Sequence, residues 1–427
     1  MKLLYIDQKF DTSSVGGAFK SSYELITELR KNKNYDIVVL ASRARPTLKK
    51  RLKVKQIPTL LRVGNKKLMD LIKYLKFNEY LSFLPILLEV YRYKPDLIIV
   101  QRNLTSIAMI VGFLTKVPVI NIIRDPMGLC PKNIDIISAY NNCIKPINRS
   151  ICWECINRWR TLRILLKDKP KGWNYSLSAA FYTLHYKISY FLTKIYLRLI
   201  NRNYVNVVAS PLMKYIVKIK SESTRTIVKK ITPIRVNDIE KFKNRYIGEF
   251  IRKLDKYKKI ILFVLPRNEG GSKGYPFVKK LIEQISSNYL FIIVGTKIYE
   301  LEKFKNTINI EKVPSSIMDY LYIKSDLTIV PSIYTEAFGR VIIESLLNRT
   351  PVLTSPQCGA NYLFKNKSYV KSLPLRIDLW IKNIKKLLSD PPKIAENEIK
   401  NLKKMFSPHS CAEDLKKLIE LVSLEPI

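Results

Sequence analysis

The sequence predicts an α/β protein made of two doubly wound domains, each with a parallel β-sheet covered by helices on both faces. Short apolar runs rich in β-branched residues alternate with helical stretches along the chain. This alternation runs through the first half and then starts again, which indicates two sheets rather than one. At 427 residues the chain is also too long for one ordinary core.

The expected strands define the domains. They are residues 2–6, 35–41, 96–101, 117–123 and 205–210 in the first series and 259–266, 290–296, 326–332 and 350–355 in the second. We place the N-terminal domain at 1–235, with a cysteine-containing basic insertion at 126–204, and the C-terminal domain at 236–395. A last helical stretch within 396–427 could pack back across the joint. Ligands bind beyond the carboxyl ends of parallel strands, so two facing sheets predict a site in the cleft between the domains.

Composition limits the function classes. The formal net charge is +40, with 75 Lys and Arg against 35 Asp and Glu, which favours nucleic acid, an acidic membrane or a phosphorylated substrate as partner. Two histidines, His185 and His409, leave little room for histidine-based chemistry. No signal peptide is visible, and Lys116 and Pro118 interrupt the apolar stretch 104–123, which predicts a helix and a buried strand. We therefore expect a cytoplasmic protein.

Two loops that follow strands could bind phosphate. Gly16 and Gly17 precede the helix expected at 19–30, and glycines at a helix start let a phosphate approach the amides. A lone Gly-Gly is, however, more often a tight turn without a ligand. After strand 259–266 come Arg267 and then Lys273-Gly274, which could clamp a diphosphate or be merely solvated.

The segment EAFGRVIIE, residues 336–344, follows the third strand of the second series. Glu336 is expected in the loop and Glu344 about one and a half turns into the next helix, at roughly 1.5 Å per residue. Amides at the helix start could hold a diphosphate while one carboxylate contacts a sugar and the other a ribose. Two ordinary glutamates on a surface helix are the alternative, and they fit this position less well.

These elements together resemble a retaining GT-B glycosyltransferase of family 4 (glycosyl transferases group 1). The resemblance rests on the E-x7-E segment 336–344, Arg267 with Lys273-Gly274, the Gly16-Gly17 loop, VVASPLMKY around Ser210 and PVLTS at 351–355, in the family's order. It implies the GT-B fold and a hexosyltransferase-type enzyme of glycan biosynthesis that uses a nucleoside-diphosphate sugar. It further implies that Arg267 and Lys273 bind the diphosphate, Glu336 the transferred sugar, and Glu344 the ribose. The backbone amides of Phe338, Gly339, Arg340 and Val341 would bind the phosphates. Ala337 would also contact the donor, and Gly16 and Gly17 would complete its site.

One loop departs from the family pattern. Many relatives carry a His-Asp pair after the fourth N-terminal strand, where this chain has Arg124-Asp125. We expect both residues on the acceptor side and count Asp125 with Glu336, Lys273 and Arg267 as catalytic candidates. The sequence has no D-x-D segment, so we expect no metal cofactor and stabilisation of the leaving group by Arg267, Lys273 and helix amides.

Four of the six cysteines, Cys130, Cys143, Cys152 and Cys155, are spaced C-x12-C-x8-C-x2-C. Four thiolates could hold a structural zinc, although the spacing is not that of a standard zinc finger. Disulfides and reduced thiols remain the alternatives.

Residues 169–221 contain no acid, and within them 177–202 predict a long aromatic helix with Lys187, Lys194, Arg198 and Arg202 along one face. Such a helix can lie on an anionic membrane, or pack on one side while its lysines are solvated. Lipid-linked acceptors among the relatives favour peripheral membrane association and a lipid-linked or cell-surface glycan acceptor. The alternatives for the whole chain are a catalytically silent sugar-nucleotide-binding relative and a basic nucleic-acid-binding protein.

Overall fold

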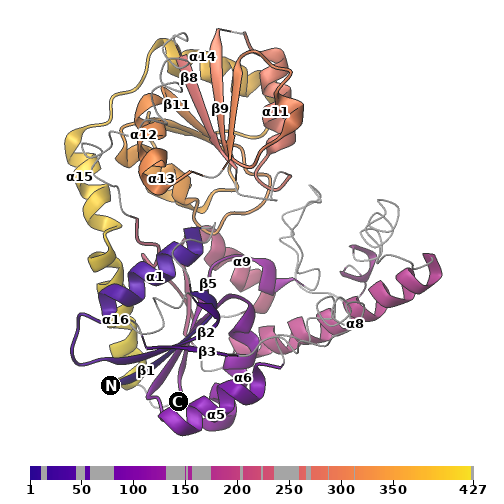
Figure 1. The fold of residues 1–427 in the computed structure, drawn as a ribbon, viewed down its shortest axis with the longest axis vertical. Helices are drawn as coiled ribbons and strands as arrows, with labels where there is room; N and C mark the ends of the chain where they lie inside the picture. The colour runs from indigo at the N-terminus through magenta and orange to yellow at the C-terminus, as the bar shows by residue number, and fades with distance from the viewer. Residues whose placement is uncertain are drawn as a thin grey trace.

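The computed structural model describes residues 1–10, 17–44, 53–57, 81–130, 150, 152–155, 175–201, 205–222, 225–234, 259–265, 271–286, 288–311 and 313–424. Within these ranges the chain forms two all-parallel sheets, with strand orders β3-β2-β1-β4-β5-β6-β7 and β10-β9-β8-β11-β12-β13. Figure 1 shows them as two domains, one above the other. The predicted fold class is confirmed.

The strands of the first sheet are β1 (Lys2–Phe10), β2 (Asp36–Ala44), β3 (Val54–Gln56), β4 (Leu97–Gln101), β5 (Val119–Ile123), β6 (Val205–Val208) and β7 (Thr226–Val228). Those of the second are β8 (Lys259–Val264), β9 (Tyr289–Gly295), β10 (Thr307–Glu311), β11 (Leu327–Val330), β12 (Val352–Thr354) and β13 (Val370–Ser372). The central strands are buried along their whole length because helices cover both faces of each sheet.

The helices of the N-terminal domain are α1 (Gly17–Leu29), α5 (Phe83–Tyr93), α6 (Thr105–Thr115), α8 (Tyr175–Ile200) and α9 (Pro211–Ser221). Those that follow are α11 (Tyr275–Gln284), α12 (Ser315–Lys324), α13 (Arg340–Leu347), α14 (Ile377–Ser389), α15 (Glu396–Met405) and α16 (Pro408–Leu424). The stretch 104–123 forms α6 and β5. No described helix is long and apolar enough to cross a membrane.

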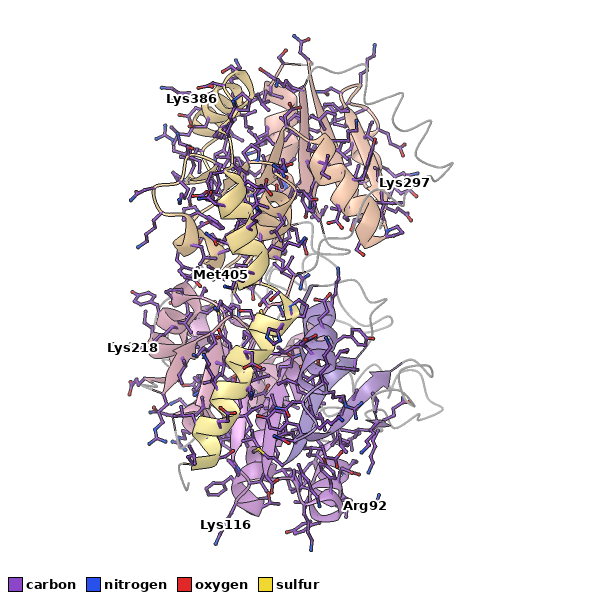
Figure 2. The ribbon with its side chains drawn as sticks, turned by 90° about the vertical axis from the view of Figure 1, so that its left-hand side faces the viewer. Arg92, Lys116, Lys218, Lys297, Lys386 and Met405 are labelled. Carbon is purple, nitrogen blue, oxygen red and sulfur yellow. The ribbon has the colours of Figure 1, made fainter. Side chains whose placement is uncertain are left out.

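The last helical stretch is two helices rather than one. It is interrupted after Met405, and Pro408, which lacks an amide hydrogen, begins α16. Figure 1 shows α15 beside the C-terminal domain and α16 along the N-terminal domain, and Figure 2 places Met405 at the level where the domains meet. The Ile234 amide donates to the Phe406 carbonyl (2.8 Å), so the chain before the second domain is bonded to the chain that returns from it.

The two domains share an apolar core at their junction. One buried cluster joins Ile231 and Ile234, which lie just before the second domain, with Ile342 of α13 and Leu415 of α16. Burial of apolar surface stabilises a contact by about 25 cal/mol per Å², so this junction favours a defined arrangement of the domains.

Candidate active site where the two sheets face each other

The site of the C-terminal domain lies where its strand order changes direction. β8 continues outward to β9 and β10, whereas β11 starts the other half of the sheet beside β8 and is followed by β12. Loops that follow strands on either side of such a switch point diverge and leave room for a ligand. The segments after β8, β11 and β12 carry Lys273, Glu336 and Gly359.

Backbone hydrogen bonds hold Glu336 against the loop that follows β12. Its amide donates to the Gln357 carbonyl (2.9 Å), and its carbonyl accepts from the Gly359 amide (3.0 Å). Glu336 therefore forms a short parallel bridge with Cys358. These bonds fix the Glu336 backbone on the strand-end loop after β12.

Lys273 and Glu336 form an ion pair. Lys273 Nζ lies 3.1 Å from Glu336 Oε1, and the side chains are 20% and 11% exposed. Ser332 Oγ donates to the same carboxylate oxygen. The Ser272 carbonyl accepts from the amides of Ile333 (3.0 Å) and Tyr334 (3.1 Å), which ties the two loops together. The structure thus joins two predicted site residues that are 63 positions apart.

Gly274 lets the Lys273 loop approach the β11 loop. Its φ is +87°, and a Cβ atom there would lie 2.0 Å from the Pro331 carbonyl oxygen. A side chain would meet both the strain of the left-handed region and a backbone clash. Gly274 therefore allows the backbone conformation that positions Lys273.

Hydrogen bonds from neighbouring segments hold the residues just before α13. Gly339, with φ of +90°, caps the helix, and Arg340 is its first residue. The carbonyls of Ala337 and Phe338 accept from Ser210 Oγ (2.7 Å) and the Ala360 amide (2.6 Å). The first-turn amides of a helix have no acceptor inside the helix, and its dipole favours an anion there.

Glu344 is oriented by two donors. Its Oε1 accepts from Arg340 Nε (3.1 Å) and its Oε2 from the Tyr322 hydroxyl (3.2 Å), while the side chain is 24% exposed. Burial, reinforced by the Glu344 charge, raises the pKa of Tyr322 well above its usual value, so the phenol stays a donor. Tyr322 was not predicted, since nothing nearby in the sequence connects α12 with Glu344.

On the N-terminal side, Arg124 turns toward the chain that joins the domains. Its Nε donates to Gln101 Oε1 (2.9 Å) and its Nη1 to the Ile231 carbonyl (2.8 Å) and Thr232 Oγ1 (3.2 Å). Burial lowers the pKa of Arg124 to about 10, which leaves it cationic at neutral pH. Asp125 lies beside it and is half-buried. Acceptor contacts of this pair remain a prediction.

A buried polar cluster lies at the switch point of the first sheet, between β1 and β4. Arg102 Nη2 lies 2.8 Å from Asp7 Oδ2, and Gln101 Nε2 donates to Asp7 and to Ser22 of α1. This cluster was not predicted from the sequence. An acid inside the apolar run of β1 was its signal, because a buried carboxylate needs a partner.

The structure does not test the roles of several predicted phosphate-binding and zinc-binding residues. Gly16, Arg267 and Cys143 lie outside the described residues, and Gly17 begins α1. Cys130 and Cys152 are half-buried, and Cys155 is exposed. No three His, Cys, Asp or Glu side chains gather as a metal-binding group in the part of the chain that is described. The four-cysteine zinc site therefore stays a prediction.

Two buried cysteines near the site should be inert toward thiol reagents. Burial, reinforced by Glu336 for Cys358 and by Asp414 for Cys411, raises the pKa of each thiol to about 12. At pH 8 only about one thiol in 10⁴ would be the reactive thiolate. We expect Ellman's reagent to modify exposed Cys155 in the native protein and Cys358 and Cys411 only after unfolding, as peptide mass spectrometry would show. Rapid native labelling of Cys358 would contradict the packing around Glu336.

The part of the chain that carries Lys273, Glu336 and Glu344 is similar to a known protein family. Residues 247–405 match the sequence model of the glycosyl transferases group 1 family. No curated protein matches the sequence. The fold is similar to a sucrose-phosphate synthase from Thermosynechococcus elongatus (TM-score 0.67, 12% identity, 99% of this chain and 98% of that chain).

Two further structures share the fold. They are HepE from Anabaena in complex with UDP and glucose (TM-score 0.64, 15% identity, 99% and 100% of the two chains) and WaaG, a glycosyltransferase involved in lipopolysaccharide biosynthesis (TM-score 0.58, 13% identity, 98% and 99%). The fold is GT-B. The family match covers the segment that holds Lys273, Glu336 and Glu344, and the prediction that the chain is a glycosyltransferase is confirmed.

Proposed function

We propose that the chain transfers a sugar from a nucleoside-diphosphate sugar to an acceptor hydroxyl, with retention of anomeric configuration and without a catalytic metal, as expected for family 4. The observation that carries this proposal is the Lys273–Glu336 ion pair at the switch point of the C-terminal sheet, close to the start of α13. A cation and helix amides suit a diphosphate, and a carboxylate held beside them suits a sugar.

The proposed roles follow from charge and position. Lys273, with the amides at the start of α13, neutralises charge that develops on the departing diphosphate. Glu336 contacts the transferred sugar, and Glu344 accepts hydrogen bonds from the ribose hydroxyls. Metal independence rests on this cation and on the absence of a D-x-D segment in the sequence. A basic nucleic-acid-binding protein would account for the net charge but not for this arrangement.

Thermal unfolding in the presence of nucleotides tests the donor class. We expect one of UDP, GDP or ADP, and its nucleotide sugars, to raise the melting temperature in EDTA. A ligand at 100 times its dissociation constant stabilises the native state by about 2.7 kcal/mol. The proposal fails if none of them raises the melting temperature, or if the increase requires a divalent metal. Retention is tested by the anomeric configuration of the product in NMR.

The location of the acceptor is a second part of the proposal. We propose that the enzyme associates peripherally with an anionic membrane and takes a lipid-linked or membrane-bound glycan acceptor. Three helices, α5, α6 and α8, pack on the same face of the N-terminal sheet, where one buried cluster takes residues from all three. Figure 1 shows α8 extending from this domain.

The outer surfaces of these helices are apolar and basic. Seven large apolar side chains on them are between 52% and 64% exposed: Leu84, Leu88, Tyr91, Phe113, Leu114, Leu184 and Phe191. Exposed cations accompany them at Arg92, Lys94, Lys116, Lys187, Lys194 and Arg198. On α8, Leu184, Lys187, Phe191, Lys194 and Arg198 are spaced three and four apart, which places them on one face. Exposed apolar side chains between cations are typical of surfaces that dock on anionic bilayers.

Vesicle sedimentation tests this surface. We expect the protein to bind phosphatidylglycerol-containing vesicles, to bind phosphatidylcholine vesicles weakly, and to dissociate as salt shortens the Debye length. Replacing Phe113 and Phe191 together by serine should weaken binding about tenfold or more, at about 0.8 kcal/mol per buried methylene. Ile323→Ser, at an exposed apolar position of the other domain, is the matched control. Equal loss in both variants would contradict the proposed surface.

A further inference from the structure

One arginine side chain connects three parts of the molecule. Arg340 Nε donates to Glu344 Oε1 (3.1 Å) within α13, while Nη1 donates to the Pro233 carbonyl (2.8 Å) and to Ser21 Oγ of α1. The first contact lies inside the C-terminal domain. The other two reach the N-terminal domain and the chain that joins the domains. Figure 1 shows α13 and α1 at the edges by which the two domains face each other.

These contacts exist only in this arrangement of the domains. Ser21 is fully buried and the Arg340 side chain is 11% exposed, so water replaces neither bond easily. A desolvated guanidinium needs acceptors for its donors. If the domains moved apart, Arg340 would lose Ser21 and Pro233 and keep Glu344. The position of its guanidinium therefore depends on both domains.

The connecting chain is held from the other side as well. Arg124 donates to the Ile231 carbonyl, two residues before Pro233. One arginine from each domain thus binds the same short segment. Movement of this segment would disturb both guanidinium groups together.

Arg340 also determines which lone pairs of Glu344 remain available. A carboxylate oxygen can accept two hydrogen bonds, and Arg340 and Tyr322 each occupy one position, on Oε1 and Oε2. Among the described residues no other hydrogen bond reaches this carboxylate, so one position is left on each oxygen, which matches the two donors of a ribose diol. The orientation of the carboxylate toward the diol therefore depends on Arg340.

We propose that Arg340 is a positioning residue that couples ribose recognition by Glu344 to the arrangement of the two domains. This inference rests on the proposed function, in which Glu344 binds the donor ribose. When Glu344 binds the ribose, the domain arrangement in which Arg340 bonds to Ser21 and Pro233 is favoured. That arrangement in turn favours binding of the ribose. Such linkage is reciprocal, and coupling of this kind typically changes affinity 5- to 150-fold, on the order of 1–3 kcal/mol.

The test compares dissociation constants for a nucleoside diphosphate and its 2′,3′-dideoxy form. The probe is UDP, GDP or ADP, whichever stabilises the wild-type protein most. We expect Arg340→Ala to weaken binding of the ribose form about 10- to 50-fold and Ser21→Ala about 3- to 10-fold. Neither should weaken binding of the dideoxy form, because that form gives Glu344 nothing to bind. Arg349→Ala, an exposed arginine just after α13, is the control and should match the wild type.

The outcomes separate the two proposals. If the wild type binds no nucleotide, or if Glu344→Gln binds the ribose form as tightly as the wild type, the proposed function fails. If Glu344→Gln weakens binding but Ser21→Ala does not, the coupling is wrong. It is also wrong if Ser21→Ala weakens both nucleotide forms equally, since that shows general damage. Ser21→Ala keeps the guanidinium and its bond to Pro233. It therefore tests the coupling even if Arg340→Ala does not fold.

Discussion

Replacing Lys273 by alanine should lower kcat about 10²- to 10³-fold while the donor KM changes much less. Removing one preorganised group that stabilises developing charge typically has this effect. Lys273 is only 20% exposed and is held beside Glu336. Water that entered in its place would therefore not stabilise the leaving-group charge as the ammonium group does. Glu336→Gln keeps the shape of the side chain and removes its charge, and it should reduce kcat to a similar degree.

Steady-state kinetics with the donor identified by thermal unfolding measures this loss. Lys279→Ala is the matched control, because Lys279 lies six residues further along and pairs with Glu300 on the surface. We expect the control to keep wild-type kcat and KM. Unchanged turnover in both Lys273→Ala and Glu336→Gln would contradict the assignment of the site.

Replacing Gly274 by alanine should destabilise the C-terminal domain and remove activity together. The left-handed conformation costs a non-glycine residue about 1–2 kcal/mol, and overpacking costs typically about 1–3 kcal/mol. The Cβ would lie 2.0 Å from the Pro331 oxygen, so the loop that carries Lys273 must move. We therefore expect a loss of about 2–5 kcal/mol in the free energy of unfolding and a kcat no higher than that of Lys273→Ala.

Guanidinium denaturation, followed by circular dichroism, measures the stability. Gly128→Ala is a suitable comparison, since the atoms nearest to a Cβ there belong to the ring of Tyr196, the closest at 3.2 Å. It should cost less than about 1.5 kcal/mol. If Gly274→Ala were as stable and as active as Gly128→Ala, the close approach of the two loops would be wrong.

The central strands of both sheets were predictable, and four edge strands were not. β1, β4, β8 and β11 are buried on both faces, so their continuous apolar runs are visible in the sequence. β3, β7 and β13 have three residues each, and β10 is mostly half-buried. Their pairing with a neighbouring strand, rather than their own pattern, makes them strands.

That Lys273 and Glu336 lie close together was predictable, because both residues follow strands. Lys273 and Glu336 come after β8 and β11, and neighbouring parallel strands end at the same edge of a sheet. Tyr322 and Ser21 were not predictable, because each meets its partner only through helix packing. The side chain of Arg340, which the resemblance placed at the donor through its amide, extends to α1. Only the relative position of the two domains decides that contact.

The proposed sugar transfer is tested most directly by the release of nucleoside diphosphate from the stabilising nucleotide sugar, with water as acceptor, in EDTA. We expect slow release by the wild-type protein, no change on adding Mg²⁺, and loss of release in Glu336→Gln and Lys273→Ala. Equal release by Glu336→Gln and the wild type, or release that requires Mg²⁺, would contradict it.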